Sequence, residues 1–313
     1  MNIADGLSAA KGEPIMFWAP LPPPIGGVTR SAAALVDWLQ VNDRCAGVVD
    51  VGQGVALPKA VRAHRKAATH LFWCSTPEAV AKYSVIARMV SGKKWIYIHG
   101  GQDETSYRVA RLLGRSVYDR VFVTNSDLID LLEPWKLGAR AELASPFAPS
   151  GRAAPRQVRP MPEKMIVAIG GYRSWYGLDV AIDAFDALKT SKGVDAPSLT
   201  VVMYGPVDGP APTDHLLEGR TDIRVERDLD PDQMVSIMRE HHTLLRPSTV
   251  DGDALIIREA LHAGLRVVAS DVVPRPAGVE ICPNTATAFA DAIMSRGIVS
   301  TGAGLGPGFT ELL

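Results

Sequence analysis

Short apolar runs alternate with longer segments of helical periodicity along the whole chain. The apolar runs are bounded by glycine, proline or charged residues and are rich in valine and isoleucine, as buried parallel strands are. In the first half they predict strands at residues 14–19, 46–51, 70–74, 94–98, 120–124 and 141–144. The segments between them predict helices at residues 32–40, 57–69, 77–89, 105–113 and 127–132. Alternating strands and helices indicate a parallel sheet covered by helices.

The second half repeats this alternation after a segment without periodic pattern. Residues 145–162 are rich in proline and small side chains, as interdomain linkers are. Strands then follow at residues 165–169, 199–204, 223–225, 243–245 and 267–269, with helices at 178–190, 231–240, 254–263 and 284–295. We therefore predict an α/β protein of two Rossmann-like, doubly wound domains: residues 1–150, a linker at 151–162, and residues 163–313.

Composition narrows the class of protein. The chain has 313 residues, 47% of them hydrophobic, which is enough for two domains with sizeable cores. A formal net charge of −1 argues against a dedicated nucleic-acid binder. Cys45, Cys74 and Cys282 are scattered and form no CxxC pair, so we expect neither a zinc site nor a disulfide framework. Without a signal-peptide pattern or an apolar run of roughly 20 residues, a cytoplasmic protein is expected.

One predicted helix, at residues 57–69, is basic. It carries Lys59, Arg62, His64, Arg65 and Lys66. Such a helix can attract anionic lipid headgroups, so a peripheral membrane contact through Lys59–Lys66 is one interpretation. We favour the alternative that these residues form a solvated helix face, because the charges are few.

The segment from residue 246 to residue 271 holds the densest candidate chemistry. Asp251, Gly252 and Asp253 form a predicted turn between a strand end and the helix at 254–263. Asp253 is a good helix N-cap, and Gly264 stands where a left-handed C-cap would fall. A helix start at the carboxyl end of a strand offers free N–H groups and partial positive charge, which favours an anion.

Two loops in the first half also fall at strand ends. Gly26, Gly27 and Val28 follow the first strand, where paired glycines let a ligand approach the backbone, although a plain turn fits as well. His99 ends the strand at 94–98 and is followed by two glycines, so it faces a ligand crevice or is simply packed. Asp103 and Glu104 could act as an acceptor-side base, and they fit equally well as acids at a helix N-terminus.

The segment 251–270 resembles the donor-binding motif of retaining glycosyltransferases with the GT-B architecture, the "glycosyl transferases group 1" (family-four) class. Their pattern is Glu, seven residues, Glu, then Ala-x-x-x-Gly and a Val-Val-x-Ser strand. The second acid is Glu259, and Ala260, Gly264 and Ser270 follow it here. The first acid position holds Asp251, whose side chain is shorter by one methylene.

The loop at residues 170–177 also resembles this family. There an Arg and a Lys-Gly pair supply two cations to the donor diphosphate. Arg173 and Gly177 match those places, but Tyr176 stands where lysine is expected. From the residues alone, Arg173 could instead form a surface salt bridge.

The resemblance implies two domains facing each other across a cleft, with the donor nucleotide held mainly by the second. Glu259 would bind the ribose, while Arg173 and the N–H groups at Ala254 and Leu255 would bind the diphosphate. The remaining donor-site residues would be Asp251, Gly252, Asp253 and His99 at the sugar, together with Gly205 at a strand end. Gly26, Gly27 and Val28 would lie near both the donor diphosphate and the acceptor.

The implied activity is retaining transfer of a sugar from a nucleoside-diphosphate sugar to a glycan, lipid-linked or small-molecule acceptor. His99, Asp251 and Asp103 are the candidate catalytic residues. No cofactor is expected, and no Asp-x-Asp metal motif ends a strand, so we predict metal-independent transfer. A nucleotide-sugar epimerase, a phosphorylase and a scaffold without donor affinity are alternatives. An oxidoreductase would need a G-x-G-x-x-G after a first strand, and neither first strand has one.

Overall fold

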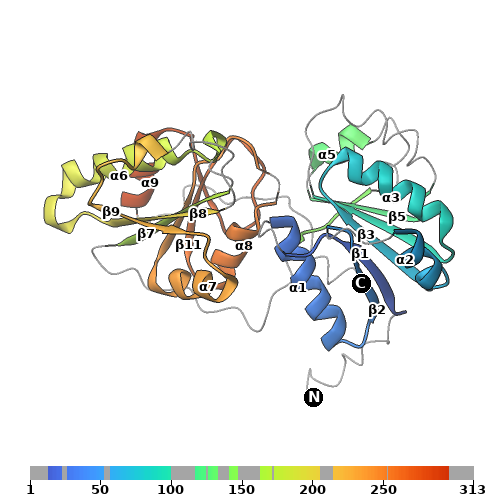
Figure 1. Cartoon of the computed structure of the whole chain (residues 1–313). Helices are drawn as coiled ribbons and strands as arrows, with labels where there is room; N and C mark the ends of the chain where they lie inside the picture. Colours follow the sequence, from blue (N-terminus) through green and yellow to red (C-terminus); the bar gives the residue numbers. More distant parts are fainter. Residues whose placement is uncertain are drawn as a thin grey trace, which may run out of the picture. The chain divides into compact units, whose positions relative to one another are not determined.

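A computed structural model describes residues 13–22, 27–52, 57–99, 117–124, 126–132, 141–146, 163–170, 173–204, 214–251 and 253–295. The chain separates into two compact units, each with its own parallel sheet (Figure 1). The last strand of the first sheet ends at Leu143, and the first strand of the second sheet begins at Lys164. The predicted linker between them lies outside the described residues.

The first unit contains a six-stranded sheet in the order β2-β1-β3-β4-β5-β6, with every neighbouring pair parallel. Its strands are β1 (Ile15–Ala19), β2 (Cys45–Asp50), β3 (Thr69–Cys74), β4 (Lys93–Ile98), β5 (Arg120–Val123) and β6 (Ala141–Leu143). Its described helices are α1 (Gly27–Val41), α2 (Leu57–His64), α3 (Pro77–Met89) and α5 (Ser126–Leu132).

Alternate residues of these strands face opposite sides of the sheet, as the two-residue period of a strand requires. Phe17 and Trp73 pack with Leu35 and Leu39 of α1 on one face. On the other face, Trp18 and its neighbours pack with residues of α2, α3 and α5. Both faces of the sheet are therefore covered, which explains why β1, an inner strand, is apolar and buried throughout.

The second unit contains a six-stranded sheet in the order β12-β11-β10-β7-β8-β9, again parallel throughout. Its strands are β7 (Lys164–Gly170), β8 (Ser198–Tyr204), β9 (Ile223–Arg227), β10 (Thr243–Arg246), β11 (Arg266–Ser270) and β12 (Glu280–Cys282). Its helices are α6 (Leu178–Lys192), α7 (Pro231–Glu240), α8 (Leu255–His262) and α9 (Ala286–Met294), with short 3₁₀ turns η4 (Ser174–Tyr176), η5 (Gly193–Asp195) and η6 (Asp214–Leu216). Helices α6 and α9 cover one face, and α7 and α8 the other.

The predicted α/β class with two doubly wound sheets is confirmed. Several helix starts follow from local chemistry that the sequence displays. Asp230 accepts the N–H of Gln233 at 2.8 Å, and the Gln233 side chain accepts the N–H of Asp230 at 2.9 Å, a capping box in front of α7. Gly264 has φ +83°, the left-handed conformation expected just after α8.

Some predicted boundaries are wrong. The basic helix ends at His64 instead of Thr69, because Thr69 pairs with Ile15 and Lys93 as the first residue of β3. Helix α1 begins at Gly27, five positions before the predicted start (32 − 27 = 5), because Ser31 turns its hydroxyl back onto the Val28 carbonyl at 2.9 Å. Strand β12 was not predicted, since it has only three residues.

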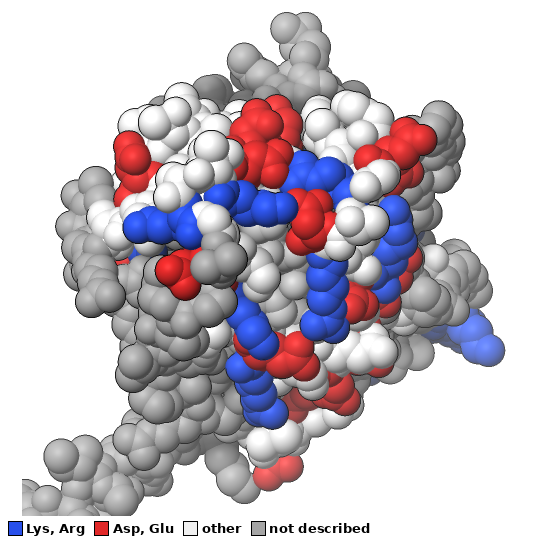
Figure 2. All heavy atoms as spheres, turned by 90° about the vertical axis from the view of Figure 1, so that its left-hand side faces the viewer, with Lys and Arg blue, Asp and Glu red and all other residues white. Residues whose placement is uncertain are grey.

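The outer edge of the second sheet, β9, is covered by paired charges of both signs. Arg220 binds Asp186 and Asp222, Arg224 binds Glu226 and Glu240, and Arg227 binds Asp214. Figure 2 shows blue and red side chains interspersed on this side. Charged side chains on an edge strand oppose pairing with another chain. Within the described residues, no helix has the length and apolar character that crossing a membrane requires.

Candidate functional site

The loops that follow β7 and β10 meet at the carboxyl edge of the second sheet. Strand β7 is the first strand of the second sheet in chain order, with β8 on one side and β10 on the other, so the strand order reverses between β7 and β10. Ligands of open α/β sheets bind at such a point. The N–H of Thr249 donates to the Trp175 carbonyl at 2.8 Å, which fastens the two loops together.

Gly177 shows how closely these loops approach. It has φ +72°, and a Cβ there would lie 2.2 Å from the carbonyl oxygen of Pro247. Only glycine combines this backbone conformation with so close a contact. The Gly that the sequence pattern places at the start of α6 is therefore required by the packing of the loop against β10.

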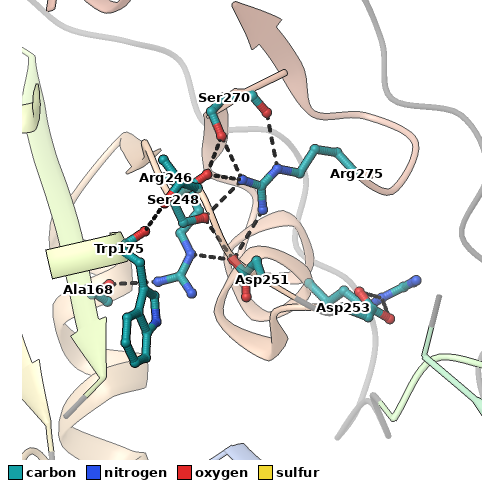
Figure 3. A network of polar contacts seen from close by, with 10 residues as sticks. Ala168, Trp175, Arg246, Ser248, Asp251, Asp253, Ser270 and Arg275 are labelled. Atoms are coloured by element: carbon teal, nitrogen blue, oxygen red, sulfur yellow. Dashed lines mark hydrogen bonds and ion pairs between the residues drawn. The ribbon is translucent and has the colours of Figure 1, made fainter. Parts of the chain in front are cut away.

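Asp251 lies at the centre of a buried polar cluster (Figure 3). Its Oδ2 accepts from Arg246 Nε at 2.8 Å, from Ser248 Oγ at 3.0 Å and from Arg275 Nη1 at 3.1 Å. Its side chain is 9% exposed, against 6% for Arg246 and 0% for Arg275. Asp251 thus holds two buried arginines, and its predicted contact with a sugar would have to use its other oxygen.

Arg275 was not identified from the sequence. Its Nη2 donates to Ser248 Oγ and to Ser270 Oγ, both at 2.9 Å, and Ser270 Oγ donates to the Ser248 carbonyl at 2.6 Å. These bonds join the loop after β11 to the loop after β10. The available signal was an arginine between two prolines, Pro274 and Pro276, just after a predicted strand.

The cluster carries more positive than negative charge. Burial alone would raise the pKa of Asp251, but the charges of Arg246 and Arg275 outweigh burial and hold this pKa below its usual value. Burial lowers the pKa of Arg275, whereas the Asp251 carboxylate outweighs burial at Arg246 and raises its pKa. Asp251 is therefore ionised, and one carboxylate faces two guanidinium groups.

Asp253 is not the N-cap of α8, contrary to the prediction. The N-cap is Ala254, which supplies no side-chain hydrogen bond. The Asp253 carboxylate instead accepts from Arg258 Nε at 2.7 and 2.8 Å, and the Asp253 side chain is fully buried. Because this carboxylate is taken by Arg258, no described side chain caps the first N–H groups of α8, including that of Leu255.

Glu259 lies on α8, one helical turn beyond Leu255, and is half-buried. This places its side chain on the helix whose start adjoins the Asp251 cluster. Binding of a ribose by Glu259 stays a prediction. Gly205 and Gly252, also expected at the donor, lie outside the described residues.

The loop after β7 presents one exposed and one packed side chain. Arg173 is exposed, with its guanidinium 5.4 Å from the ring centre of Trp175. No ion pair of Arg173 exists in the part of the chain that the structure describes. The Tyr176 ring, by contrast, lies under the guanidinium of Arg246 at 4.4 Å. The residue in the expected lysine position is therefore the stacking partner of a different cation.

In the first unit, His99 adjoins the start of α1. Its Nε2 lies 3.3 Å from Ser31 Oγ, which also accepts from Trp73 Nε1 at 3.3 Å. The imidazole packs against the rings of Trp73 and Tyr97, each at 4.7 Å. Burial lowers the pKa of His99 to about 3, so the ring is neutral near pH 7.

This contact brings together two of the segments predicted from the sequence. Gly27 and Val28 form the first turn of α1, and Ser31 links that helix to His99. Gly26 and Asp103 lie outside the described residues, so their predicted roles stay predictions. In the basic segment, Lys59, Arg62, Arg65 and Lys66 are exposed, and contact with a membrane likewise stays a prediction.

Known proteins resemble this chain in part of its sequence and in its fold. Residues 163–295 match the sequence model of the family described as glycosyl transferases group 1. No curated protein sequence matches the chain. Among solved structures, sucrose-phosphate synthase from Thermosynechococcus elongatus is 15% identical with a TM-score of 0.64, over 90% of this chain and 89% of that chain.

Two further structures share the fold over most of both chains. The lipopolysaccharide outer core galactosyltransferase WaaB is 11% identical with a TM-score of 0.57, covering 89% of this chain and 88% of that one. An α,α-trehalose-phosphate synthase (UDP-forming) from Burkholderia xenovorans is 12% identical with a TM-score of 0.51, covering 92% and 93%. Residues 163–295 therefore match a glycosyl transferases group 1 domain, and the chain as a whole shares the GT-B fold of these glycosyltransferase structures.

Proposed function

We propose that this protein transfers a sugar from a nucleoside-diphosphate sugar to a hydroxyl of a glycan, lipid-linked or small-molecule acceptor, with retained anomeric configuration and without a metal ion. The observation that carries the proposal is the start of α8. This helix begins without a side-chain cap, beside a buried cluster of net positive charge, at the carboxyl edge of the group 1 domain. A diphosphate is the anion that such a site suits.

The donor would be bound by residues of the second unit. The N–H groups at Ala254 and Leu255, with exposed Arg173, would meet the diphosphate, and Glu259 would accept from the ribose hydroxyls. Negative charge builds up on the diphosphate as the glycosidic bond breaks. Donors and cations aimed at that charge lower the barrier, so this side of the site would supply the main catalytic stabilisation.

The first unit would contribute His99 and the start of α1. A neutral imidazole can donate a hydrogen bond from one ring nitrogen and accept one at the other, which suits the hydroxyl groups of the donor sugar. The acceptor would lie near Gly27 and Val28, where the first turn of α1 begins next to Ser31 and His99.

The name of one structural neighbour refers to the nucleoside diphosphate that it releases, and this agrees with the proposed class of donor. The trehalose-phosphate synthase with this fold is UDP-forming. Nucleoside diphosphates are therefore the first ligands to test, and a screen of thermal unfolding should show stabilisation by at least one of them. A ligand at 100 times its Kd adds about 2.7 kcal/mol to the free energy of unfolding.

A scaffold that has kept the fold without transferring sugar is the second candidate. Two observations favour it: Asp251 is tied to two arginines, and Tyr176 replaces the expected lysine. Transfer from a panel of nucleotide sugars to mixed glycan and lipid-linked acceptors separates the two functions. Binding of a diphosphate without transfer to any acceptor would support the scaffold.

The same assay tests independence of metal ions. Transfer should continue at an undiminished rate in excess chelator, because the proposed stabilisation of the leaving group comes from arginine and backbone N–H groups. Loss of transfer in chelator, restored only by magnesium or manganese, would contradict this part of the proposal.

A further inference from the structure

The buried cluster around Asp251 contains one positive charge more than the described side chains around it balance. Arg246 and Arg275 share the one carboxylate of Asp251, and all three side chains are less than a tenth exposed. Among the described residues, no second carboxylate forms an ion pair with either arginine. The neighbouring pair of Arg258 and Asp253 is balanced in charge. A surplus buried charge is costly unless an anion accompanies it, so the cluster is built for an anionic ligand.

Of the two arginines, Arg246 is the better placed to bind an anionic ligand. It ends β10, next to β7, where the strand order reverses. Its Nε donates to Asp251 and its Nη1 donates to the Ala168 carbonyl, both at 2.8 Å. These acceptors use two of the five N–H donors of a guanidinium. The ring of Tyr176 stacks on the Arg246 guanidinium at 4.4 Å. Together with Asp251 and the Ala168 carbonyl, it fixes the plane of the guanidinium.

Arg275 has a different set of contacts. Its donors go to Ser248, to Ser270 and to Asp251, and its side chain is fully buried. It holds the loops after β10 and β11 in register and fixes the carboxylate that orients Arg246. Its contacts are thus those of a positioning residue.

We infer that Arg246 supplies the second positive charge for the donor diphosphate, in place of a lysine at position 176, and that Asp251 and Arg275 are positioning residues for it. This inference rests on the proposed function. The Tyr176 ring stacks on the Arg246 guanidinium. The positive charge at the end of β10 therefore lies beside the loop that carries Arg173. One exposed and one buried arginine would then neutralise the two phosphates.

The test compares each nucleoside diphosphate with its monophosphate. We expect the wild-type chain to bind the diphosphate more tightly, and Arg246→Met to lose about 10-fold to 100-fold of that preference, the effect of one charge-assisted hydrogen bond. Affinity for the monophosphate should stay within about threefold. Calorimetry measures both affinities, and thermal unfolding reports whether each variant is folded.

Arg246→Met keeps Asp251 paired with Arg275, which favours folding. If it nevertheless unfolds, Arg246→Gln removes the charge and keeps an amide donor for Asp251. Arg275→Met removes an equal charge from the same cluster and should reduce the diphosphate preference less than Arg246→Met does. Arg224→Met, at the distant edge strand β9, is the control for loss of an exposed arginine.

The most decisive comparison moves the positive charge from position 246 to position 176. The double variant Arg246→Met with Tyr176→Lys should regain most of the diphosphate preference, because it restores a cation at the same loop. A double variant as weak as Arg246→Met alone would overturn the inference. So would an unchanged preference in Arg246→Met, or an equal loss in Arg275→Met.

The outcome for the wild-type chain separates this inference from the function on which it rests. If wild type binds no nucleoside diphosphate more tightly than its monophosphate, the proposed donor site itself is wrong. If wild type shows the preference and Arg246→Met retains it, the donor site stands and only the role of Arg246 is overturned.

Discussion

Ser31 Oγ lies 3.3 Å from Nε2 of His99, and this contact joins the start of α1 to the carboxyl end of β4. The two residues are 68 positions apart in the chain. They meet because β1 and β4 both deliver their following segments to one edge of a parallel sheet, with Trp73 of β3 between them. Two segments that the sequence marked separately thus lie side by side.

His99→Ala should reduce the turnover of sugar transfer by about tenfold to a hundredfold, the loss expected for one hydrogen bond to a group that develops charge. Affinity for the nucleoside diphosphate should be unchanged, because the residues proposed to bind it lie in the other unit. Steady-state kinetics and calorimetry measure the two effects. A matched variant, Ser31→Ala, keeps the imidazole and removes the hydroxyl that contacts it and Trp73, so it should lose less. Full turnover in His99→Ala would remove this residue from the proposed site.

Glu259→Ala should weaken binding of the nucleoside diphosphate by about tenfold, because hydrogen bonds to a charged carboxylate contribute roughly 1.5–3 kcal/mol. A nucleoside diphosphate that lacks the ribose hydroxyls should bind wild type and variant alike. Calorimetry with both ligands checks this. Unchanged affinity of the variant for the normal ligand would show that the ribose is bound elsewhere.

Gly177→Ala should destabilise the second unit and weaken diphosphate binding together. A side chain there is strained at φ +72°, and its Cβ would meet the Pro247 carbonyl oxygen at 2.2 Å, pushing apart the loops after β7 and β10. We expect a loss of about 1–3 kcal/mol in the free energy of unfolding. The matched control is Gly219→Ala, where φ is also +72° but no other described atom lies within 4 Å. Chemical denaturation that gives equal losses for both variants would contradict the close packing of these loops.

The first unit should lose stability in mild acid because of His70. Burial lowers the pKa of this imidazole to about 4, and Trp18 Nε1 donates to its Nδ1 at 3.1 Å. In the unfolded chain the pKa is about 6.5, so the unfolded chain binds more protons between these values. The free energy of unfolding should therefore fall as the pH falls from about 6.5 to 4, by up to about 3 kcal/mol.

Denaturation with urea at a series of pH values measures this dependence. The His70→Asn variant keeps an acceptor for Trp18 and does not titrate, so its free energy of unfolding should change less over the same range. Burial also lowers the pKa of His99 and His241, and these groups should leave part of the slope in the variant. Identical slopes in the two proteins would exclude His70 as a source of the acid sensitivity.

Much of the fold could be predicted from local pattern. Pro77–Met89 was predicted as a helix, and the structure has the same bounds, with Thr76 accepting from the N–H of Ala79 at its start. The parallel strands were recognisable as short apolar runs because both of their faces are buried. Boundaries were missed where tertiary pairing overrides helical pattern, as at Thr69, which belongs to β3.

The sequence by itself determined the alternation of strands and helices, the family resemblance, and the strand ends that carry candidate chemistry. The order of predicted strands and helices placed Asp251, Glu259 and Arg173 near the carboxyl ends of the strands in the second sheet. In a parallel sheet these ends lie on one side. Only the tertiary structure decided the partners of these groups. Asp253 caps no helix because Arg258 occupies it, and Asp251 binds Arg246 and Arg275. Such pairings depend on which loops pack together across the sheet, and no local pattern in the chain records them.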